Sequence, residues 1–242
     1  MLELKNISFD VESGGQDKEI IHDISLVIPD EKLIVVTGPN GGGKSTLARI
    51  IAGIEKPTSG SIYFDGEDIT EKTITERAKL GIGFAFQMPV RFKGIQVKDL
   101  IRLATGGSIS TADACRYLSH VGLCARDYID REVNSSLSGG ELKRIEIATV
   151  LAKASKLSIF DEPEAGIDLW SFQNLIEVFE NMRKDITGSS ILIISHQERI
   201  LNIADEIVVL RDGRLVMQGS KEEVLPELIG TASAVKSCDK VL

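Results

Sequence analysis

The sequence predicts an α/β fold in which a mostly parallel β-sheet carries helices. Three short apolar runs, Leu157–Phe160, Ile191–Ile194 and Ile207–Leu210, are separated by segments long enough for helices, as in a parallel sheet. Hydrophobic residues make up 43% of the chain but aromatic residues only 5%, which favours buried aliphatic strands over an aromatic-rich sandwich. A length of 242 residues suits a single domain, 1–242, with subdomains.

The amino-terminal part of the chain predicts an antiparallel β subdomain. Alternating apolar residues in Leu2–Phe9 and in Ile20–Ile28 indicate strands on either side of a turn around Ser13-Gly14-Gly15. After a break, Ser61–Phe64 and the Asp65-Gly66 turn predict a hairpin that continues this sheet. Leu33–Thr37 is a buried parallel strand in this interpretation, and the helix-compatible Lys44–Ala52 follows it.

The middle of the chain predicts a helical insertion at about 88–134. Its residues from Ile95 to Tyr128 are helical in character, with glycine joints at Gly106-Gly107-Ser108 and Gly122. The core is then assigned to 1–87 and 135–225, with a final hairpin at Asp212-Gly213 and a loose tail at 230–242.

Composition disfavours several classes of function. Lys and Arg number 28 against 36 Asp and Glu, a net charge of −8 that disfavours a nucleic-acid coat. Cys115, Cys124 and Cys238 are too few and too far apart for a disulfide framework or a zinc site, which favours free thiols in the cytoplasm. No apolar run is long enough for a signal peptide or a membrane span, so we expect no direct membrane insertion.

A glycine-rich loop between the strand Leu33–Thr37 and the next helix predicts a phosphate-binding P-loop. Glycine tolerates the positive φ that lets backbone N–H groups converge on phosphate, and the helix adds its positive end. Lys44 then neutralises the terminal phosphates, while the Ser45 hydroxyl is a ligand for Mg²⁺. The alternative is a plain glycine-rich turn. The predicted nucleotide-binding residues here are Gly38, Pro39, Asn40, Gly41, Gly42, Gly43, Lys44, Ser45 and Thr46.

Two adjacent carboxylates end the apolar strand Leu157–Phe160. Ligands of open α/β sheets bind at the carboxyl ends of strands, and successive strand residues face opposite ways. Asp161 therefore suits a Mg²⁺ shell, and Glu162 suits a general base for attack on a γ-phosphate. A solvated acidic pair at the surface is the alternative.

Ser138-Gly139-Gly140-Glu141 opens a helix and predicts a second anion-binding helix start. The apolar face of this helix is Leu142, Ile145, Ala148, Leu151 and Ala152, with Lys143, Arg144 and Glu146 mostly on the opposite face. The alternative is a serine N-cap with a flexible turn.

In their order along the chain, these motifs resemble those of the ABC ATPase family. The set comprises the P-loop at 38–46, Gln87, the signature Leu137–Glu141, Asp161-Glu162, the segment Ala165–Asp168 and His196. The resemblance implies a P-loop (RecA-like) core and ATP with Mg²⁺. It also implies an ATP-dependent homodimer in which Ser138, Gly139 and Gly140 contact the nucleotide held by the opposite P-loop. Gln87 would sense the γ-phosphate and contact Mg²⁺, and His196 would orient the attacking water. Glu162, His196 and Gln87 are thus the expected catalytic residues.

Further details are similar to SufC, the ATPase of the Suf iron-sulfur cluster assembly system. They are Ala85–Val90 followed by Gly94-Ile95, Glu141, Glu164 and His196–Leu201. Where many transporter subunits stack an aromatic ring on adenine this chain has Val11, and whether Phe9 substitutes stays open. Leu137, Pro163 and the short span between Gly94 and Asn134 depart from SufC.

The resemblance to SufC implies that ATP-driven dimer closure moves a soluble SufB-like scaffold through the residues after Gln87. The alternatives are an ATP-binding subunit that binds a transmembrane transporter subunit, and a nucleotide-gated module that does not hydrolyse ATP.

Overall fold

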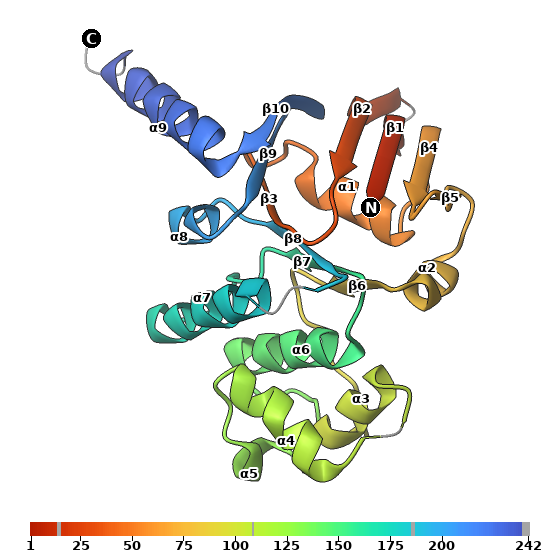
Figure 1. Ribbon diagram of the computed structural model, residues 1–242, viewed down its shortest axis with the longest axis vertical. Coiled ribbons are helices and arrows are strands. Elements are labelled where there is room, and N and C mark those ends of the chain that lie inside the picture. The colour runs from red at the N-terminus through yellow and green to blue at the C-terminus, as the bar shows by residue number, and fades with distance from the viewer. Residues whose placement is uncertain (14–15, 108, 185–186, 239–242) are drawn as a thin grey trace.

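The computed structural model describes residues 1–13, 16–107, 109–184 and 187–238, and within them ten strands form two sheets (Figure 1). The predicted turn residues Gly14, Gly15 and Ser108 lie outside this part. One sheet has the order β10-β9-β3-β8-β7-β6 and the other β2-β1-β4-β5. The strands are β1 (Leu2–Ser13), β2 (Gln16–Ile28), β3 (Leu33–Thr37), β4 (Ser59–Phe64), β5 (Glu67–Asp68), β6 (Ile82–Ala85), β7 (Leu157–Asp161), β8 (Ser190–Ile194), β9 (Glu206–Arg211) and β10 (Arg214–Ser220).

The larger sheet is parallel from β9 to β6, and β10 joins it as an antiparallel edge strand. The smaller sheet is antiparallel throughout. The predicted α/β class with its antiparallel β subdomain and helices is therefore confirmed. The helices are α1 (Lys44–Ala52), α2 (Ile74–Leu80), α3 (Val97–Ala104), α4 (Thr111–His120), α5 (Ala125–Tyr128), α6 (Gly139–Lys153), α7 (Leu169–Lys184), α8 (Glu198–Asn202) and α9 (Lys221–Cys238).

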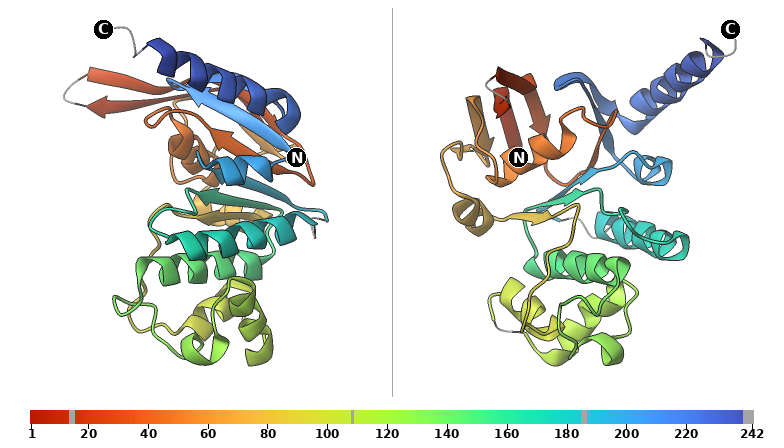
Figure 2. Two further views of the ribbon diagram at one scale, coloured as in Figure 1. Left: turned by 90° about the vertical axis from the view of Figure 1, so that its left-hand side faces the viewer. Right: turned by 180° about the vertical axis from the view of Figure 1, so that it is seen from behind.

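The parallel strands separate two hydrophobic clusters, because successive residues of a strand point to opposite faces. On β3, Leu33 and Val35 contribute to one cluster, while Ile34 and Val36 contribute to the other. The first cluster takes in α6, α7 and the helical segment α3–α4, and the second takes in α1 and the antiparallel sheet. The helical segment lies below α6 in the views of Figures 1 and 2, away from the antiparallel sheet.

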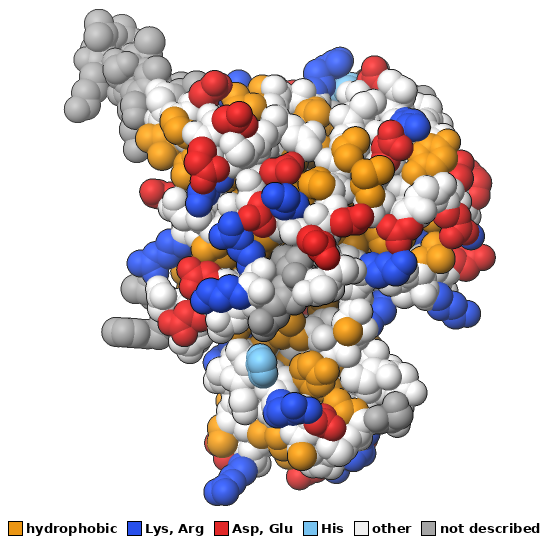
Figure 3. Space-filling view, viewed as in Figure 1, with side chains coloured by type: hydrophobic (Ala, Val, Ile, Leu, Met, Phe, Trp, Pro, Cys, Tyr) orange, Lys and Arg blue, Asp and Glu red, His pale blue; other side chains and the backbone are white. Residues whose placement is uncertain are grey.

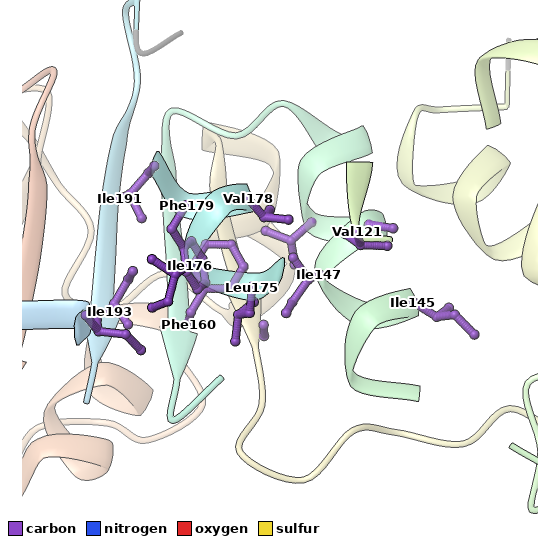
Figure 4. Close-up of a cluster of buried hydrophobic side chains, with 14 of the residues drawn as sticks. Val121, Ile145, Ile147, Phe160, Leu175, Ile176, Val178, Phe179, Ile191 and Ile193 are labelled. Atoms are coloured by element: carbon purple, nitrogen blue, oxygen red, sulfur yellow. The ribbon is translucent and has the colours of Figure 1, made fainter. Parts of the chain in front are cut away.

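Aromatic packing fills the first cluster beneath β7. The rings of Phe160 and Phe179 lie edge to face with their centroids 5.0 Å apart, an arrangement that aromatic pairs favour. Figure 4 shows both rings among Ile191 and Ile193 of β8 and Ile147 of α6. This packing holds the strand that ends at Asp161 against its neighbour β8.

A buried arginine fixes the far end of α1. Arg77 is 1% exposed, and its guanidinium donates to the carbonyl oxygens of Ile50 and Ile51, the last turn of α1. Further bonds reach the carbonyls of Thr70 and Lys72. Because the last carbonyls of a helix have no partner within it, Arg77 completes the hydrogen bonding of the helix that carries Lys44 at its other end.

Several elements differ from the sequence-based expectations. The short strand β6 and the helix α2 were not among the expected elements, and β1 and β2 are longer than expected. The backbone stays helical to Cys238, where the sequence predicts a loose tail, and α9 projects from the body in Figures 1 and 2. No helix in the described part of the chain combines the length and the apolar character needed to cross a bilayer.

The two described cysteine side chains do not share a helix. Cys115 lies in α4, whereas Cys124 immediately precedes α5. The chain leaves α4 at Val121, between the two positions. Both thiols are free, and the side chain of Cys238 lies outside the described residues.

Candidate functional site

The glycine-rich loop links the buried strand β3 to α1 and places Lys44 at the first position of that helix. Gly38, Gly41 and Gly43 have φ values of 135°, 77° and 91°, in the region that only glycine adopts without strain. At Gly38 a Cβ atom would lie 1.9 Å from the carbonyl oxygen of Leu210, so no other residue fits there. The loop is thus packed against β9 as well as being shaped for phosphate.

Lys44 is buried beneath this loop, with only 5% of its surface exposed. Its Nζ donates to the carbonyl oxygens of Gly38 and Pro39, each at 2.8 Å. Burial lowers the pKa of Lys44, and the charges of Glu162 and Asp161 oppose that effect. The ammonium group is therefore held inside the loop, where a bound phosphate chain would lie.

Ser45 and Asp161, which are 116 positions apart in the sequence, meet at the carboxyl ends of β3 and β7. The Ser45 hydroxyl donates to Asp161 Oδ1 at 2.8 Å. Burial is the main cause that raises the pKa of Asp161, and the Ser45 hydrogen bond opposes it. A hydroxyl and a desolvated carboxylate are hard oxygen ligands, so this pair fits Mg²⁺, whose charge would compensate the buried carboxylate.

Glu162 follows Asp161 in a left-handed conformation with a φ of 43°. This conformation costs a non-glycine residue about 1 kcal/mol, as is common at functional sites. Glu162 lines the same cavity as Lys44, and its Oε2 accepts a hydrogen bond from Gln87 Nε2 at 2.5 Å. The structure therefore brings Gln87 beside Glu162, while the described contacts give Gln87 no bond to Ser45 or Asp161.

A cavity of about 510 Å³ contains most of the predicted site residues, within the usual range for ligand sites. His196 lies at its edge and is exposed. Gly38 and Pro39 do not line the cavity, but their carbonyl oxygens accept from the Lys44 ammonium group that does. The cavity is lined by Lys18, Ile20, Asn40, Gly41, Gly42, Gly43, Lys44, Ser45, Thr46, Gln87, Glu162 and His196.

Two residues of β2 line the cavity without any signal in the sequence that points to them. Lys18 and Ile20 come from the antiparallel sheet, and only the fold places them beside the P-loop. Val11 pairs with Lys18 in the sheet but is 40% exposed and does not line the cavity. Phe9 packs against the second hydrophobic cluster and is not among the residues that line the cavity.

The signature residues lie elsewhere. Ser138 caps α6, where its hydroxyl accepts from the Glu141 backbone N–H and the Glu141 carboxylate accepts from the Ser138 backbone N–H. Tyr128 also donates to Glu141. Ser138, Gly139 and Gly140 do not line the cavity around Lys44. Within one chain, therefore, the structure does not bring the two predicted anion-binding helix starts together.

The helix that follows Ser138 is buried on more faces than the sequence predicts. Lys143 is 0% exposed, although the periodicity places it and Glu146 on the face opposite the apolar residues. That expectation is wrong because α6 is enclosed by the sheet on one side and by α3 and α4 on the other. In the sequence, the apolar residues Ile147 and Val150, which lie outside the predicted apolar face and are buried, could have indicated that this helix is enclosed.

Glu164 joins the loop after β7 to the end of β8. The buried Ser195 hydroxyl donates to Glu164 Oε1 and accepts from the backbone N–H of Gln197. Burial is the main cause that raises the pKa of Glu164 above its usual range, against the hydrogen bond from Ser195. This contact connects the segment 164–168 with the strand that positions His196.

We expect the Glu164→Gln substitution to make folding stability less dependent on pH. Since the pKa of Glu164 is raised, the folded chain holds more protons than the unfolded chain just above pH 4.5, and its free energy of unfolding falls as pH rises. The uncharged amide of the variant would remove this loss and still accept a hydrogen bond from Ser195. The gain in stability over the unaltered chain should therefore grow from pH 4.5 to pH 8 in denaturant unfolding. The exposed Glu180→Gln is the matched control, and a gain independent of pH would contradict this interpretation of Glu164.

A family model and several known proteins match the sequence of this chain. The family model described as "ABC transporter" matches residues 21–165. An uncharacterized ABC transporter ATP-binding protein of Methanocaldococcus jannaschii is 39% identical over 216 residues, which cover 86% of each chain. The sulfate/thiosulfate import ATP-binding protein CysA of Mesorhizobium japonicum is 33% identical over 211 residues, which are 84% of this chain but only 60% of CysA.

The fold also matches solved structures. An ATP-binding cassette solved as a dimer in a post-hydrolysis state, with ADP and Pi bound, superimposes with a TM-score of 0.82 at 22% identity. The match covers 91% of this chain and 99% of that cassette. This likeness shows that the arrangement of the two sheets and the helices is that of an ATP-binding cassette.

Proposed function

Since this chain belongs to the ABC transporter family, we propose that it is the ATP-binding subunit that drives a partner protein of a membrane transporter. The family is one of ATP-hydrolysing cassettes, so the chain is an ATPase that uses ATP with Mg²⁺. The proposed part is the identity of the protein that this ATPase drives. The names of the relatives described above, among them an import ATP-binding protein, support a transporter over other clients.

The residues at the cavity divide the proposed reaction between them. Lys44 and the N–H groups of the glycine loop hold the phosphates, and Ser45 with Asp161 would hold Mg²⁺, which supplies charge neutralisation when bound. Glu162 accepts the proton of the attacking water, and His196 orients that water. Gln87, hydrogen-bonded to Glu162, sets the direction of its carboxylate. Hydrolysis then needs no covalent intermediate on the protein.

A homodimer that closes around ATP gives the signature residues a function. Ser138 and Gly139 are exposed at the start of α6, and they do not line the cavity of their own chain. We infer that they bind the phosphates held by the Lys44 loop of a second copy, using the positive end of α6. Each copy would then supply half of two composite sites.

The partner surface in this proposal is a hydrophobic groove whose lining includes Phe86 and Val90, one on either side of Gln87 in the sequence. This groove, of about 150 Å³, is the observation that carries the proposal, because residues that flank Gln87 in the sequence line an apolar hollow where another protein could dock. Met88 is 80% exposed beside it, and the exposed Arg91 and Lys93 add positive charge. Its lining is Phe84, Phe86, Val90, Phe92, Leu100, Val133, Leu142, Ile145, Glu146, Thr149 and Val150.

A test of this surface is Phe92→Glu, which places a charge in the groove without touching the nucleotide cavity. We expect stimulation of ATP hydrolysis by the partner to fall at least tenfold, while hydrolysis by the chain alone stays within about twofold, since burying an unpaired charge costs several kcal/mol. Val216→Glu is the matched control, because Val216 is similarly exposed but lies on β10. Equal stimulation of both variants would rule out the groove as the docking surface.

A soluble SufB-like scaffold is the second candidate partner. It is favoured by Glu164, which resembles the acidic residue of SufC and is hydrogen-bonded to Ser195, and by the described lining of the nucleotide cavity, which contains no Phe, Tyr or Trp side chain. Purification of the chain with its bound partner separates the candidates. A polytopic membrane protein supports the transporter, and a soluble β-rich scaffold supports the Suf-like role. The third alternative, a module that does not hydrolyse ATP, is not supported, because the family is one of ATP-hydrolysing cassettes.

A further inference from the structure

Helix α6 carries a buried ion pair that the reaction described above does not use. Lys143 and Glu146 lie one helical turn apart, with Lys143 Nζ 3.2 Å from Glu146 Oε2. The Lys143 side chain is 0% exposed and that of Glu146 is 15% exposed. Burial raises the pKa of Glu146, and the positive charge of Lys143 opposes this. Removing two charged groups from water costs several kcal/mol of free energy for each, so the presence of this pair in the core needs an explanation.

The remaining hydrogen bonds of this pair all go to the backbone at Phe86 and Gln87. Glu146 Oε1 accepts from the Phe86 N–H at 2.9 Å. Lys143 donates to the Phe86 carbonyl oxygen, and its Nζ lies 3.4 Å from the Gln87 carbonyl oxygen. The two side chains thus hydrogen-bond to one short backbone segment, Glu146 to its N–H group and Lys143 to its carbonyl oxygens.

This backbone segment follows the end of β6 and carries the catalytic side chain of Gln87. β6 ends at Ala85, so Phe86 and Gln87 have no ladder partner on either side that could fix their position. The side chain of Gln87 in turn donates to Glu162. A continuous series of contacts therefore leads from α6, which is capped by Ser138, through the ion pair and the Gln87 backbone to the Glu162 carboxylate.

We propose that Lys143 and Glu146 are positioning residues for ATP hydrolysis, which hold the backbone at Gln87 so that its side chain aims the Glu162 carboxylate. Neither residue of the pair lines the nucleotide cavity. It ties the helix that presents the signature motif to the segment that leads into the hydrophobic groove. The role concerns hydrolysis by the chain itself, so it holds whichever partner occupies the groove.

The decisive variant is the double substitution Lys143→Met with Glu146→Leu. Replacing a buried ion pair by apolar residues of similar size is often neutral or stabilising, so we expect the double variant to fold with an unchanged thermal midpoint. In this variant the backbone of Phe86 and Gln87 loses its hydrogen bonds to the two side chains. We therefore expect kcat to fall at least tenfold, whereas the KM for ATP should stay within threefold. Loss of a positioning contact that acts on the transition state has this signature.

Lys153→Met is the matched control. Lys153 lies on the same helix and also donates to a backbone carbonyl, that of Ile82, at 2.8 Å. Ile82 is the first residue of β6, at the end of the strand opposite Gln87. The kcat of this control should stay within twofold. A double variant with kcat within twofold of the unaltered chain, or with KM rising as much as kcat falls, would overturn the proposal. If the double variant fails to fold, Glu146→Gln, which keeps the side-chain shape, decides by the same two constants.

Discussion

Glu162→Gln should slow ATP hydrolysis by about 10² to 10⁴-fold, the contribution of a positioned general base. The substitution keeps the size of the side chain and an oxygen that can accept from Gln87 Nε2, but it removes the group that takes the proton of the attacking water. Nucleotide binding should persist, because Lys44, Ser45 and the glycine loop are unchanged. Single-turnover phosphate release and equilibrium binding of ATP measure the two effects separately.

Glu177→Gln provides the comparison for this result, since Glu177 is an exposed carboxylate on α7. It should hydrolyse ATP at the rate of the unaltered chain. The slow Glu162→Gln variant should also accumulate the ATP-bound dimer, visible as a doubling of mass in size-exclusion chromatography with light scattering. Normal hydrolysis by this variant would remove Glu162 from its role as the base.

Lys44→Ala should lower ATP affinity about 100-fold. Hydrogen bonds to a charged group contribute about 1.5–3 kcal/mol each, and 1.4 kcal/mol corresponds to a tenfold change in the dissociation constant. The ammonium group is buried inside the loop, so no other described side chain replaces it there. Equilibrium binding of a fluorescent ATP analogue, with thermal unfolding to verify the fold, measures the change.

Lys18→Ala is the natural companion variant. Lys18 lines the same cavity from β2, whereas the Lys44 ammonium group is held by Gly38 and Pro39 of the loop. We expect its effect on affinity to stay within about fivefold, as for an exposed charge near a ligand. Equal losses in the two variants would show that the cavity acts by overall charge, and unchanged affinity in Lys44→Ala would refute the phosphate-binding role.

The local parts of the site could be predicted from the sequence, because their chemistry depends on residues that are neighbours along the chain. The glycine loop, its strand and its helix follow from residue types within a span of twenty positions. The meeting of Ser45 with Asp161 was also predicted, since both follow buried strands whose carboxyl ends share one edge of the sheet.

Other features depend on contacts that the sequence does not specify. Lys143 was assigned to the solvent face because helical periodicity describes one helix and not what encloses it. The four residues of β6 are too few to produce a recognisable pattern. Lys18 and Ile20 reach the nucleotide cavity only because the antiparallel sheet packs over α1. The cases of Lys143 and of the two β2 residues share one cause, the packing together of segments that are distant in the sequence.

The close approach of Gly38 to the Leu210 carbonyl has a consequence for genetics. A side chain at this position would collide with the backbone of β9 before any nucleotide arrived, so the damage would fall on assembly of the core. In a screen for loss of growth, replacements of Gly38 and of Lys44 would look alike. Only the abundance of the protein in the cell would separate them, with the glycine variants degraded and the lysine variants present but inert.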